Sequence, residues 1–487
     1  MVFQRRYFLR LTTGRSPEWG IWYPKSSFEL YPEKEMRCEK GQAWYNSRPM
    51  KKYHVWTEGC QMNVADSQRL GSALERLGYI FTGKAEDADV IVLNTCVVRQ
   101  SAEDKATNRL NSLRPLKAKN PGLVVNLMGC LVGIRDNDKL RSRFPFVDVF
   151  SPPSDPGPLI SFLTQGEARA FEDRETRERY TEMDGDFTLP EHERGKTVSV
   201  HLSVVLGCSH ACTFCIIPSR RGAERSRPVD QILTEARSLA EQGVKEITLL
   251  GQIVDRYGKD LPGGLNLAGL LRRLDQVEGL ERIRFLTSHP NYFDEQLMDT
   301  AAELPKVMSH IEIPIQAGDD TILKKMRRGY LQADYRAKVT KIRERIPDCS
   351  IATDVIVGFP GETEAQFMET FHLLEELRLD VAHLARYSPR PETVSERLYP
   401  DDVPGDEKMR RFRLLENLQE KISGEINAQL LGRRVNVLFE EKVKGRWRGR
   451  TPTNKLVFVE SDENLRGTIR PVTITWTGPW SMQAGIS

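Results

Sequence analysis

The sequence predicts an α/β protein with an N-terminal parallel α/β domain, a central partial β/α barrel and a small C-terminal antiparallel β-barrel. Between residues 52 and 150, apolar runs rich in β-branched residues alternate with segments of helical spacing, which is typical of a parallel sheet. The alternation resumes at residue 201 with six strand candidates, fewer than the eight of a complete β/α barrel. After Gly432 the pattern changes to short β-rich runs separated by turns, which favours a small barrel.

The individual elements follow in chain order from these patterns. The first domain contains the strand candidates YHVWTEGC, DVIVLNTC and LVVNLMGC, with helices expected at ADSQRLGSALERLG and RQSAEDKATNRLNSLRPLKAK. The central strand candidates are HLSVVLG, KEITLLG, RIRFLTS, HIEIPI, IATDVIVG and VAHLARYS. A long helix is expected at DEKMRRFRLLENLQEKISGEINAQLLG, followed by the strands RRVNVLFEE, GRWRGR, KLVFVE and GTIRPVTITW of an OB-like module.

The 487 residues are enough for several domains, whose boundaries follow from changes in composition. We expect a first domain at 50–165, a charged linker at 166–200, the barrel at 201–430 and the C-terminal module at 431–487. Residues 1–49 show no helix or strand periodicity and carry a net charge of +4. They are either an accessory extension or lie upstream of a translation start at Met50; we favour the second interpretation.

The overall charge excludes one class of function. With 71 basic and 68 acidic residues the net charge is +3, which excludes binding to nucleic acid or membrane through overall charge alone. Any such binding must use local basic patches. The C-terminal module is such a patch, with a net charge of +5. No apolar run is long enough to span a bilayer, and the N-terminus lacks the apolar core of a secretory signal. We therefore expect a cytoplasmic protein.

Three of the eight cysteines form the spacing C-x-x-x-C-x-x-C at Cys208, Cys212 and Cys215. Three thiolates on a short loop can bind three irons of a cubic iron–sulfur cluster and leave the fourth iron open. An open iron can hold the amino and carboxylate groups of S-adenosylmethionine, whose reductive cleavage generates a carbon radical. From these residues alone, two alternatives remain: a zinc site with His210 or a distant fourth ligand, and three core thiols.

Three further cysteines, Cys60, Cys96 and Cys130, each end one of the strand candidates of the first domain. The carboxyl ends of parallel strands share one edge of the sheet, where ligands bind. We therefore expect these thiols to converge on one spot, although buried strand-end cysteines without a ligand are an equal alternative. Cys38 and Cys349 are expected to be non-ligands.

The motif GCSHACTFCIIPSRRGAERSR resembles the methylthiotransferase branch of the radical S-adenosylmethionine enzymes. The resemblance continues through LTSHP, IPIQAGDD, TDVIVGFPGET and YSPRPET, and extends from Met50 to the end of the chain. The C-terminal module resembles TRAM domains, which bind RNA. Gly59-Cys60-Gln61-Met62-Asn63, followed by Asp66-Ser67, is similar to the tRNA-2-methylthio-N6-dimethylallyladenosine synthases. Ile253, Glu312, Ala317 and Glu392 depart from the family pattern and leave the fit of S-adenosylmethionine and substrate open.

The resemblance implies two [4Fe-4S] clusters, one on Cys208, Cys212 and Cys215 and an auxiliary one on Cys60, Cys96 and Cys130. It also implies two roles for S-adenosylmethionine, as methyl donor and as the source of a radical that abstracts the hydrogen at C2 of the modified adenine. The methylthio group then replaces this hydrogen. The implied partners are the tRNA anticodon loop, an electron-donor protein and a sulfur source, with the chain acting as a monomer.

Two other functions remain as alternatives. The same chemistry can act on threonylcarbamoyl-adenosine in tRNA or on a ribosomal protein, although the GCQMN motif weighs against both. A non-catalytic, zinc-stabilised RNA-binding protein is the alternative from another class.

The remaining candidate residues lie near strand ends or in basic clusters, and none is assigned a catalytic acid–base role. Expected contacts with S-adenosylmethionine are Gly251, Gln252, Ser288, Gln316 and Asp354. Expected RNA contacts are Arg220, Arg221 and Arg225 beside the cysteine loop, with Arg227 in the same cluster, and Arg446, Trp447 and Arg448, with Arg450, in the last module. The alternative for Gly251 and Gln252 is a turn at a strand end, and that for the arginines beside the cysteine loop is a solvated charged loop. The alternative for the run around Trp447 is an ordinary hairpin edge with surface charge.

Overall fold

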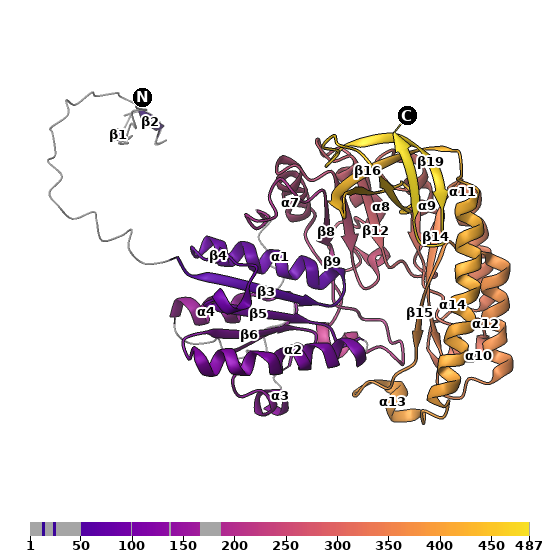
Figure 1. Cartoon of the computed structure of the whole chain (residues 1–487), viewed down its shortest axis with the longest axis horizontal. Coiled ribbons are helices and arrows are strands. Elements are labelled where there is room, and N and C mark those ends of the chain that lie inside the picture. Colours follow the sequence, from indigo (N-terminus) through magenta and orange to yellow (C-terminus); the bar gives the residue numbers. More distant parts are fainter. Residues whose placement is uncertain are drawn as a thin grey trace. The chain divides into compact units, whose positions relative to one another are not determined.

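A computed structural model describes residues 50–98, 100–135, 138–165 and 187–486, together with two short strands near the N-terminus (Figure 1). These strands, β1 (Thr12–Gly14) and β2 (Tyr23–Lys25), pair in antiparallel fashion. The chain divides into two units at Pro49, and everything below concerns Met50–Ser487. The rest of the expected extension, Cys38 within it, and residues 166–186 of the expected linker lie outside the described residues.

The first domain is a five-stranded parallel sheet in the order β4-β3-β5-β6-β7. Its central strand is buried along its whole length, because helices cover both faces of a parallel sheet. The three sequence-predicted strands are present, and the structure adds β4 and β7, which are too short to give a periodic signal. The elements are β3 (Lys52–Glu58), α1 (Gln61–Arg76), β4 (Ile80–Phe81), β5 (Val90–Thr95), α2 (Gln100–Lys119), β6 (Val124–Gly129), α3 (Asp138–Arg143), β7 (Val149–Ser151) and α4 (Gly157–Gln165).

The central domain contains the six predicted strands in two parallel sheets of three, β12-β11-β8 and β13-β14-β15. Their bounds are β8 (Ser199–Ser203), β11 (Glu246–Leu250), β12 (Arg282–Leu286), β13 (His310–Glu312), β14 (Ser350–Val357) and β15 (Val381–Arg386). A short antiparallel pair, β9 (Val205–Leu206) and β10 (Arg225–Ser226), flanks the cysteine loop. The helices are α6 (Ile217–Arg221), α7 (Val229–Glu241), α8 (Leu267–Leu274), α9 (Glu295–Glu303), α10 (Asp320–Lys325), α11 (Gln332–Arg345), α12 (Glu364–Leu377) and α13 (Val394–Leu398).

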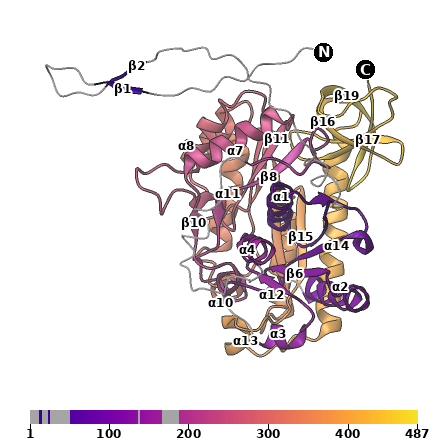
Figure 2. The ribbon, with the colours of Figure 1, turned by 90° about the vertical axis from the view of Figure 1, so that its left-hand side faces the viewer.

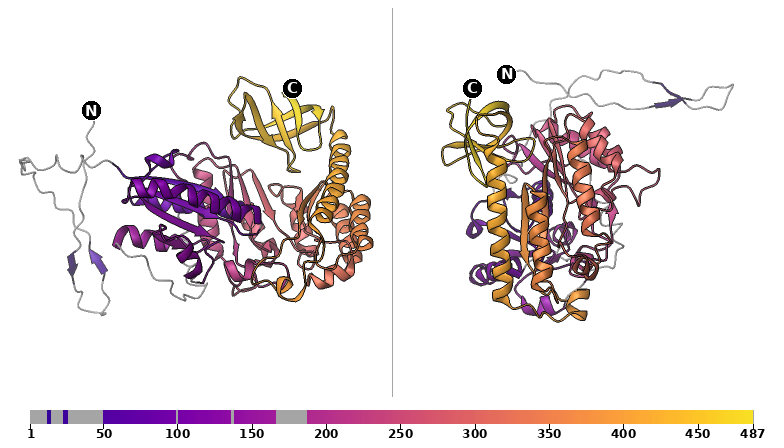
Figure 3. Two further views of the ribbon diagram at one scale, coloured as in Figure 1. Left: turned by 60° about the horizontal axis from the view of Figure 1, so that its bottom comes forward. Right: turned by 90° about the vertical axis from the view of Figure 1, so that its right-hand side faces the viewer.

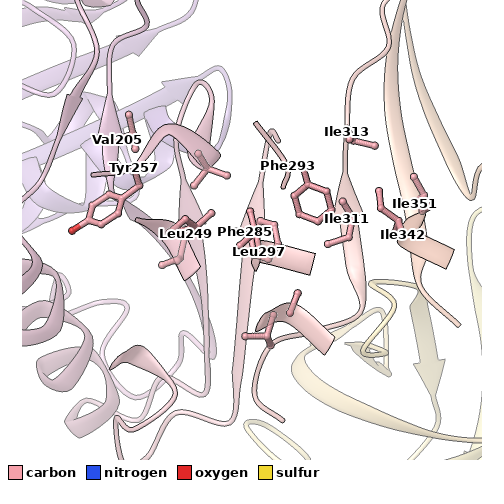
Figure 4. Close-up of a cluster of buried hydrophobic side chains, with 14 of the residues drawn as sticks. Val205, Leu249, Tyr257, Phe285, Phe293, Leu297, Ile311, Ile313, Ile342 and Ile351 are labelled. Carbon is pink, nitrogen blue, oxygen red and sulfur yellow. The ribbon is translucent and has the colours of Figure 1, made fainter. Parts of the chain in front are cut away.

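One continuous apolar core joins the two sheets of the central domain. Leu249, Phe285 and Ile311 come from successive strands, and Phe293 and Leu297 cover them from the segment that follows β12 (Figure 4). All five side chains are nearly inaccessible to solvent. Because the core runs unbroken across β11, β12, β13 and β14, the two sheets form one open barrel, as the sequence predicts.

The long helix α14 (Gly405–Ala428) leads into the C-terminal module and packs beside α12 and β15 (Figure 3). The module is a closed barrel of β16 (Arg434–Val443), β17 (Arg446–Arg450), β18 (Leu456–Val459), β20 (Met482–Ile486) and β19 (Ile469–Thr477). Four of its pairings are antiparallel, but β18 and β20 are parallel. The predicted small antiparallel barrel is therefore present with one parallel pair, because a closed ring with an odd number of strands cannot alternate direction throughout.

The first domain meets the barrel through α1, which lies beside β8 (Figure 2). Arg69 of α1 forms an ion pair with Glu235 of α7. Within the described ranges, no helix is both long and apolar enough to cross a membrane.

Candidate functional site

The three strand-end cysteines of the first domain line one cavity of about 160 Å³. Cys60 follows β3 and begins α1, while Cys96 and Cys130 directly follow β5 and β6. These three strands are neighbours in the sheet, so their carboxyl ends bring the thiols to the same edge. We call this group the auxiliary site.

Asn63, within the GCQMN motif, fixes the backbone around the auxiliary site. Its side-chain amide donates to Asn94 Oδ1 at 2.9 Å and to the carbonyl of Thr95 at 3.1 Å, while its oxygen accepts from the Cys60 N–H at 3.2 Å. A Cβ at Gly59 would lie 2.3 Å from Asn63 Oδ1, so this close approach requires glycine. The motif thus supplies both the Cys60 sulfur and the hydrogen bonds that fix the backbone position of Cys60.

Arg221 joins the auxiliary site to the central domain. Its Nε donates to Cys130 Sγ at 3.2 Å, and its Nη2 lies 3.4 Å from Asp66 Oδ2. Ser154 completes the group by donating to Asp66 Oδ1 at 2.7 Å. The guanidinium and the Asp66 carboxylate are each only 1% exposed. The prediction that Arg221 contacts RNA is therefore wrong, because the guanidinium is enclosed between the two domains.

The second cysteine group follows β9, and we call it the radical site. Cys208 Sγ accepts from the backbone N–H of His210 at 3.4 Å, and the Cys208 N–H donates to the carbonyl of Gly222 at 3.0 Å. Cys215 N–H donates to the carbonyl of Cys212, which closes the loop tightly. The Ile217 side chain packs with Cys208 and Cys215 and also lines the auxiliary cavity, so the two sites adjoin.

Arg328 was not anticipated from the sequence, although it lies in an unassigned Arg-Arg-Gly-Tyr run. Its Nη1 donates to Cys212 Sγ at 3.2 Å, and His210 Nδ1 lies 3.1 Å from the same sulfur. The His289 ring is tilted against the His210 ring with 4.7 Å between the centroids. Burial, together with the nearby Arg328, lowers the pKa of His289 to about 2, so this imidazole is neutral.

Burial favours the protonated form of three of these thiols, whereas a hydrogen bond with Cys96 lowers the pKa of Cys60 to about 6. Burial raises the pKa of Cys208 to about 11 and that of Cys215 to about 12, and it also raises the pKa of Cys130. Thiolates are the ligands of iron–sulfur clusters, so cluster binding must release these protons. Within the described residues, no three His, Cys, Asp or Glu side chains are grouped around the position of one metal ion. Each site supplies three cysteines, and cysteine thiolates are the usual ligands of iron–sulfur clusters, so the donor set fits such a cluster.

The candidates for S-adenosylmethionine contacts differ in position and surroundings, and Asp354 lies within β14 rather than at a strand end. Gly251 and Gln252 line the auxiliary cavity, and Gln252 Nε2 donates to Met62 Sδ at 2.9 Å. The Ser288 hydroxyl donates to Asp255 Oδ1 at 2.7 Å. Gln316 has a positive φ of 80° and pairs through its backbone with Asp354 and its neighbours.

Glu312 also lines the auxiliary cavity. In the sequence it stands out only as a residue that departs from the family pattern. Burial, reinforced by the nearby Asp354 carboxylate, raises the pKa of Glu312 to about 7. The cavity therefore contains a carboxyl group that is partly protonated at neutral pH.

The remaining basic candidates are divided between surface and interior. Trp447 is 5% exposed and packs in the core of the C-terminal barrel, so the prediction that its ring stacks on RNA is wrong. Arg446 and Arg448, its neighbours on the opposite face, are partly exposed. Arg220 Nη2 contacts Glu392, and Arg225 is half-buried on β10. Arg227 is fully buried and pairs with Glu235.

Comparison with known proteins agrees with this geometry. Residues 202–374 match the radical SAM superfamily, and residues 52–151 match the uncharacterized protein family UPF0004. The fold is shared with the radical S-adenosylmethionine methyltransferase TsrM from Kitasatospora setae, whose structure contains cobalamin and a [4Fe-4S] cluster. Its TM-score is 0.54 at 14% identity, covering 82% of this chain and 81% of that one. The fold and the cysteine loop thus define a radical S-adenosylmethionine enzyme with a second three-cysteine site.

Relatives of high sequence identity show to which family of radical S-adenosylmethionine enzymes the chain belongs. A tRNA-2-methylthio-N(6)-dimethylallyladenosine synthase of Roseiflexus sp. is 47% identical over 89% of each chain. One of Dehalococcoides mccartyi (strain CBDB1) is 46% identical over 89% of this chain and 97% of its own length. The chain belongs to this family of tRNA-2-methylthio-N(6)-dimethylallyladenosine synthases.

Proposed function

We propose that the protein converts N6-dimethylallyladenosine beside the tRNA anticodon to its 2-methylthio derivative. The observation that carries this proposal is the pair of adjoining three-cysteine sites in a chain 46–47% identical to curated synthases of this reaction. The radical site would hold one [4Fe-4S] cluster on Cys208, Cys212 and Cys215, and the auxiliary site a second on Cys60, Cys96 and Cys130. When bound, the clusters and S-adenosylmethionine supply radical formation and sulfur donation at the unactivated C2 position.

The protein's own contribution is to bind, orient and enclose the reacting groups. The auxiliary cavity is lined on one side by the three cysteines and on another by Gly251, Gln252 and Thr287, which follow β11 and β12. Leu250 and Leu286 add apolar surface. A base inserted there would lie between the auxiliary sulfur ligands and the open end of the barrel, where S-adenosylmethionine is expected.

A second cavity, of about 420 Å³, supports the choice of tRNA as substrate. It lies between the first turn of α1, the strands of the central domain and the C-terminal barrel. Its basic side chains are Lys196, Arg284, Arg448, Arg450 and Arg466, and its acidic ones are Glu246, Glu440 and Glu441. Gln61 and Leu286 line both cavities, so the basic cavity adjoins the auxiliary cavity.

This arrangement suits an unpaired RNA loop. Arginine and lysine side chains position phosphates, while sequence-specific recognition targets bases that are unstacked from a single-stranded loop. We infer that the anticodon loop binds at the basic cavity and that its modified adenine enters the auxiliary cavity. An electron-donor protein and a sulfur source complete the proposed reaction; the chain acts as a monomer in the cytoplasm, where tRNA is modified.

Nucleoside analysis of tRNA tests this function. In cells that lack the gene, 2-methylthio-N6-dimethylallyladenosine should disappear and N6-dimethylallyladenosine should accumulate. The wild-type gene and a Cys349→Ala variant, which changes a cysteine outside both sites, should restore the product, whereas Cys212→Ala should not. Persistence of the product in the deletion strain, with no second enzyme supplying it, would refute the substrate assignment.

A further inference from the structure

Each of the two cysteine sites contains one buried arginine that donates a hydrogen bond to one sulfur. At the radical site Arg328 Nη1 donates to Cys212 Sγ, and at the auxiliary site Arg221 Nε donates to Cys130 Sγ; both distances are 3.2 Å. Arg328 is 5% exposed and Arg221 is 1% exposed. N–H···S hydrogen bonds from surrounding groups are a recognised determinant of cluster potential.

The two arginines differ in how their charge is balanced. Arg221 forms an ion pair with Asp66 at 3.4 Å, so the auxiliary site contains a guanidinium and a carboxylate together. The other donors of Arg328 reach neutral oxygens: Nε donates to the Tyr330 hydroxyl at 2.9 Å and Nη2 to the carbonyl of Pro314 at 3.1 Å. In the part of the chain that the structure describes, no carboxylate pairs with Arg328.

The other charged groups near the radical site do not supply the missing anion. Arg256 is itself a cation, and Glu224 is taken up by its two hydrogen bonds from Arg256 Nε, at 2.7 and 2.8 Å. The His210 and His289 rings are no source of an anion either, because an imidazole is neutral or positively charged. A buried cation without a counter-ion is strongly unfavourable, so Arg328 requires an anion at Cys212.

A cubic cluster held by three thiolates is such an anion. The assembly carries a net negative charge, which grows by one when the cluster is reduced. A fixed buried cation in contact with one of the sulfurs therefore stabilises the reduced form more than the oxidised form.

We propose that Arg328 is the counter-cation of the radical-site cluster and raises its reduction potential through Cys212. The cluster of the auxiliary site does not gain this increase in potential, because the Asp66 carboxylate neutralises the charge of Arg221. The inference rests on the proposed function for the presence of the clusters. It assigns Arg328 as a positioning residue rather than a catalytic one, since it acts through a ligand.

The experiment compares the full-length wild-type protein with Arg328→Lys and Arg328→Met after anaerobic reconstitution with iron and sulfide. Iron and sulfide per chain measure loading, and a redox titration followed by electron paramagnetic resonance measures the midpoint potential. The radical-site signal is recognised because it changes when S-adenosylmethionine is added. Arg221→Met, measured in parallel, shows whether a change is specific to one cluster.

Arg328→Met should either shift the radical-site midpoint potential to a more negative value or reduce the iron content by about half, to one cluster per chain. Arg328→Lys keeps the charge and should retain both clusters with a smaller shift. A wild-type potential and loading in Arg328→Met would overturn the inference. An equal shift in potential or an equal loss of iron in Arg328→Met and Arg328→Lys would also overturn it, because the shape of the guanidinium rather than its charge would then matter. A wild-type chain that binds no iron would instead refute the proposed function.

Discussion

Replacement of Gly129 by alanine tests how the sheet edge positions the auxiliary cysteines. Gly129 ends β6 directly before Cys130 and has a φ of +100°, which L side chains rarely adopt. A Cβ there would lie 2.5 Å from the carbonyl oxygen of Thr95 and 2.6 Å from Asn94 Oδ1. The Thr95 carbonyl also accepts from the Cys130 N–H at 2.9 Å, so relief of the contact must separate Cys130 from the end of β5.

The expected cost has two parts. Alanine at positive φ costs about 1–2 kcal/mol, and forcing an added carbon against packed backbone costs about 1–3 kcal/mol, so Gly129→Ala should destabilise by about 2–5 kcal/mol. Gly243→Ala is the matched control: its φ is +93°, and nothing lies within 4 Å of the added Cβ. The control should therefore lose only about 1–2 kcal/mol.

Two assays separate stability from cluster binding. Urea unfolding of the metal-free proteins gives the free-energy differences, and anaerobic iron analysis gives the loading. Gly129→Ala should fall from about eight irons per chain towards four, while Gly243→Ala should keep both clusters. If Gly129→Ala is no less stable than Gly243→Ala and binds the same iron as the wild type, the argument that close backbone contact positions Cys130 is wrong.

Three further predictions follow from the site and the barrel. Trp447→Ala should destabilise the protein by about 3–5 kcal/mol in urea unfolding, since the ring is core; a change in tRNA affinity without loss of stability would contradict this. Arg466→Glu should weaken tRNA binding and reduce the slope of log affinity against log salt concentration by about one. The control Glu463→Gln changes an exposed residue nearby and should not weaken binding. Because the pKa of Glu312 is raised to about 7 by burial, the folded state holds a proton that the unfolded state has lost; stability should fall as pH rises from about 4.5 to 7. Glu312→Gln should flatten this part of the profile, and an unchanged slope in urea unfolding at pH 5 and 7.5 would contradict it.

The strands and helices of both β/α domains could be predicted from sequence because their apolar periodicity is a local property of the chain. β5 and β14 read directly as buried strands, and α7 reads as an amphipathic helix between two of them. The edge strands β4 and β7 were missed, since two or three residues carry no period. The parallel pairing of β18 with β20 was missed because it follows from closing the barrel.

The convergence of Cys60, Cys96 and Cys130 on one cavity could be predicted from the sequence, but the surroundings of the arginines could not. Alternation along β17 already places Trp447 on the face opposite Arg446 and Arg448, and the structure shows that this face is the core. Arg221 looked like part of a surface cluster, but its guanidinium reaches Cys130 in another domain. Arg328 carried no signal, because 116 residues separate it from Cys212.

The sequence by itself determined which cysteines are candidates for ligands: their spacing and their position at strand ends predict two groups of three, because residue identity and local periodicity are properties of the chain. Only the tertiary structure decided the electrostatics around those thiolates. The charge on Arg221 is balanced by Asp66 and that on Arg328 by no described carboxylate, and these contacts exist only after distant segments have packed. The energy of a buried charge depends on what surrounds it in space, which no local pattern of residues records.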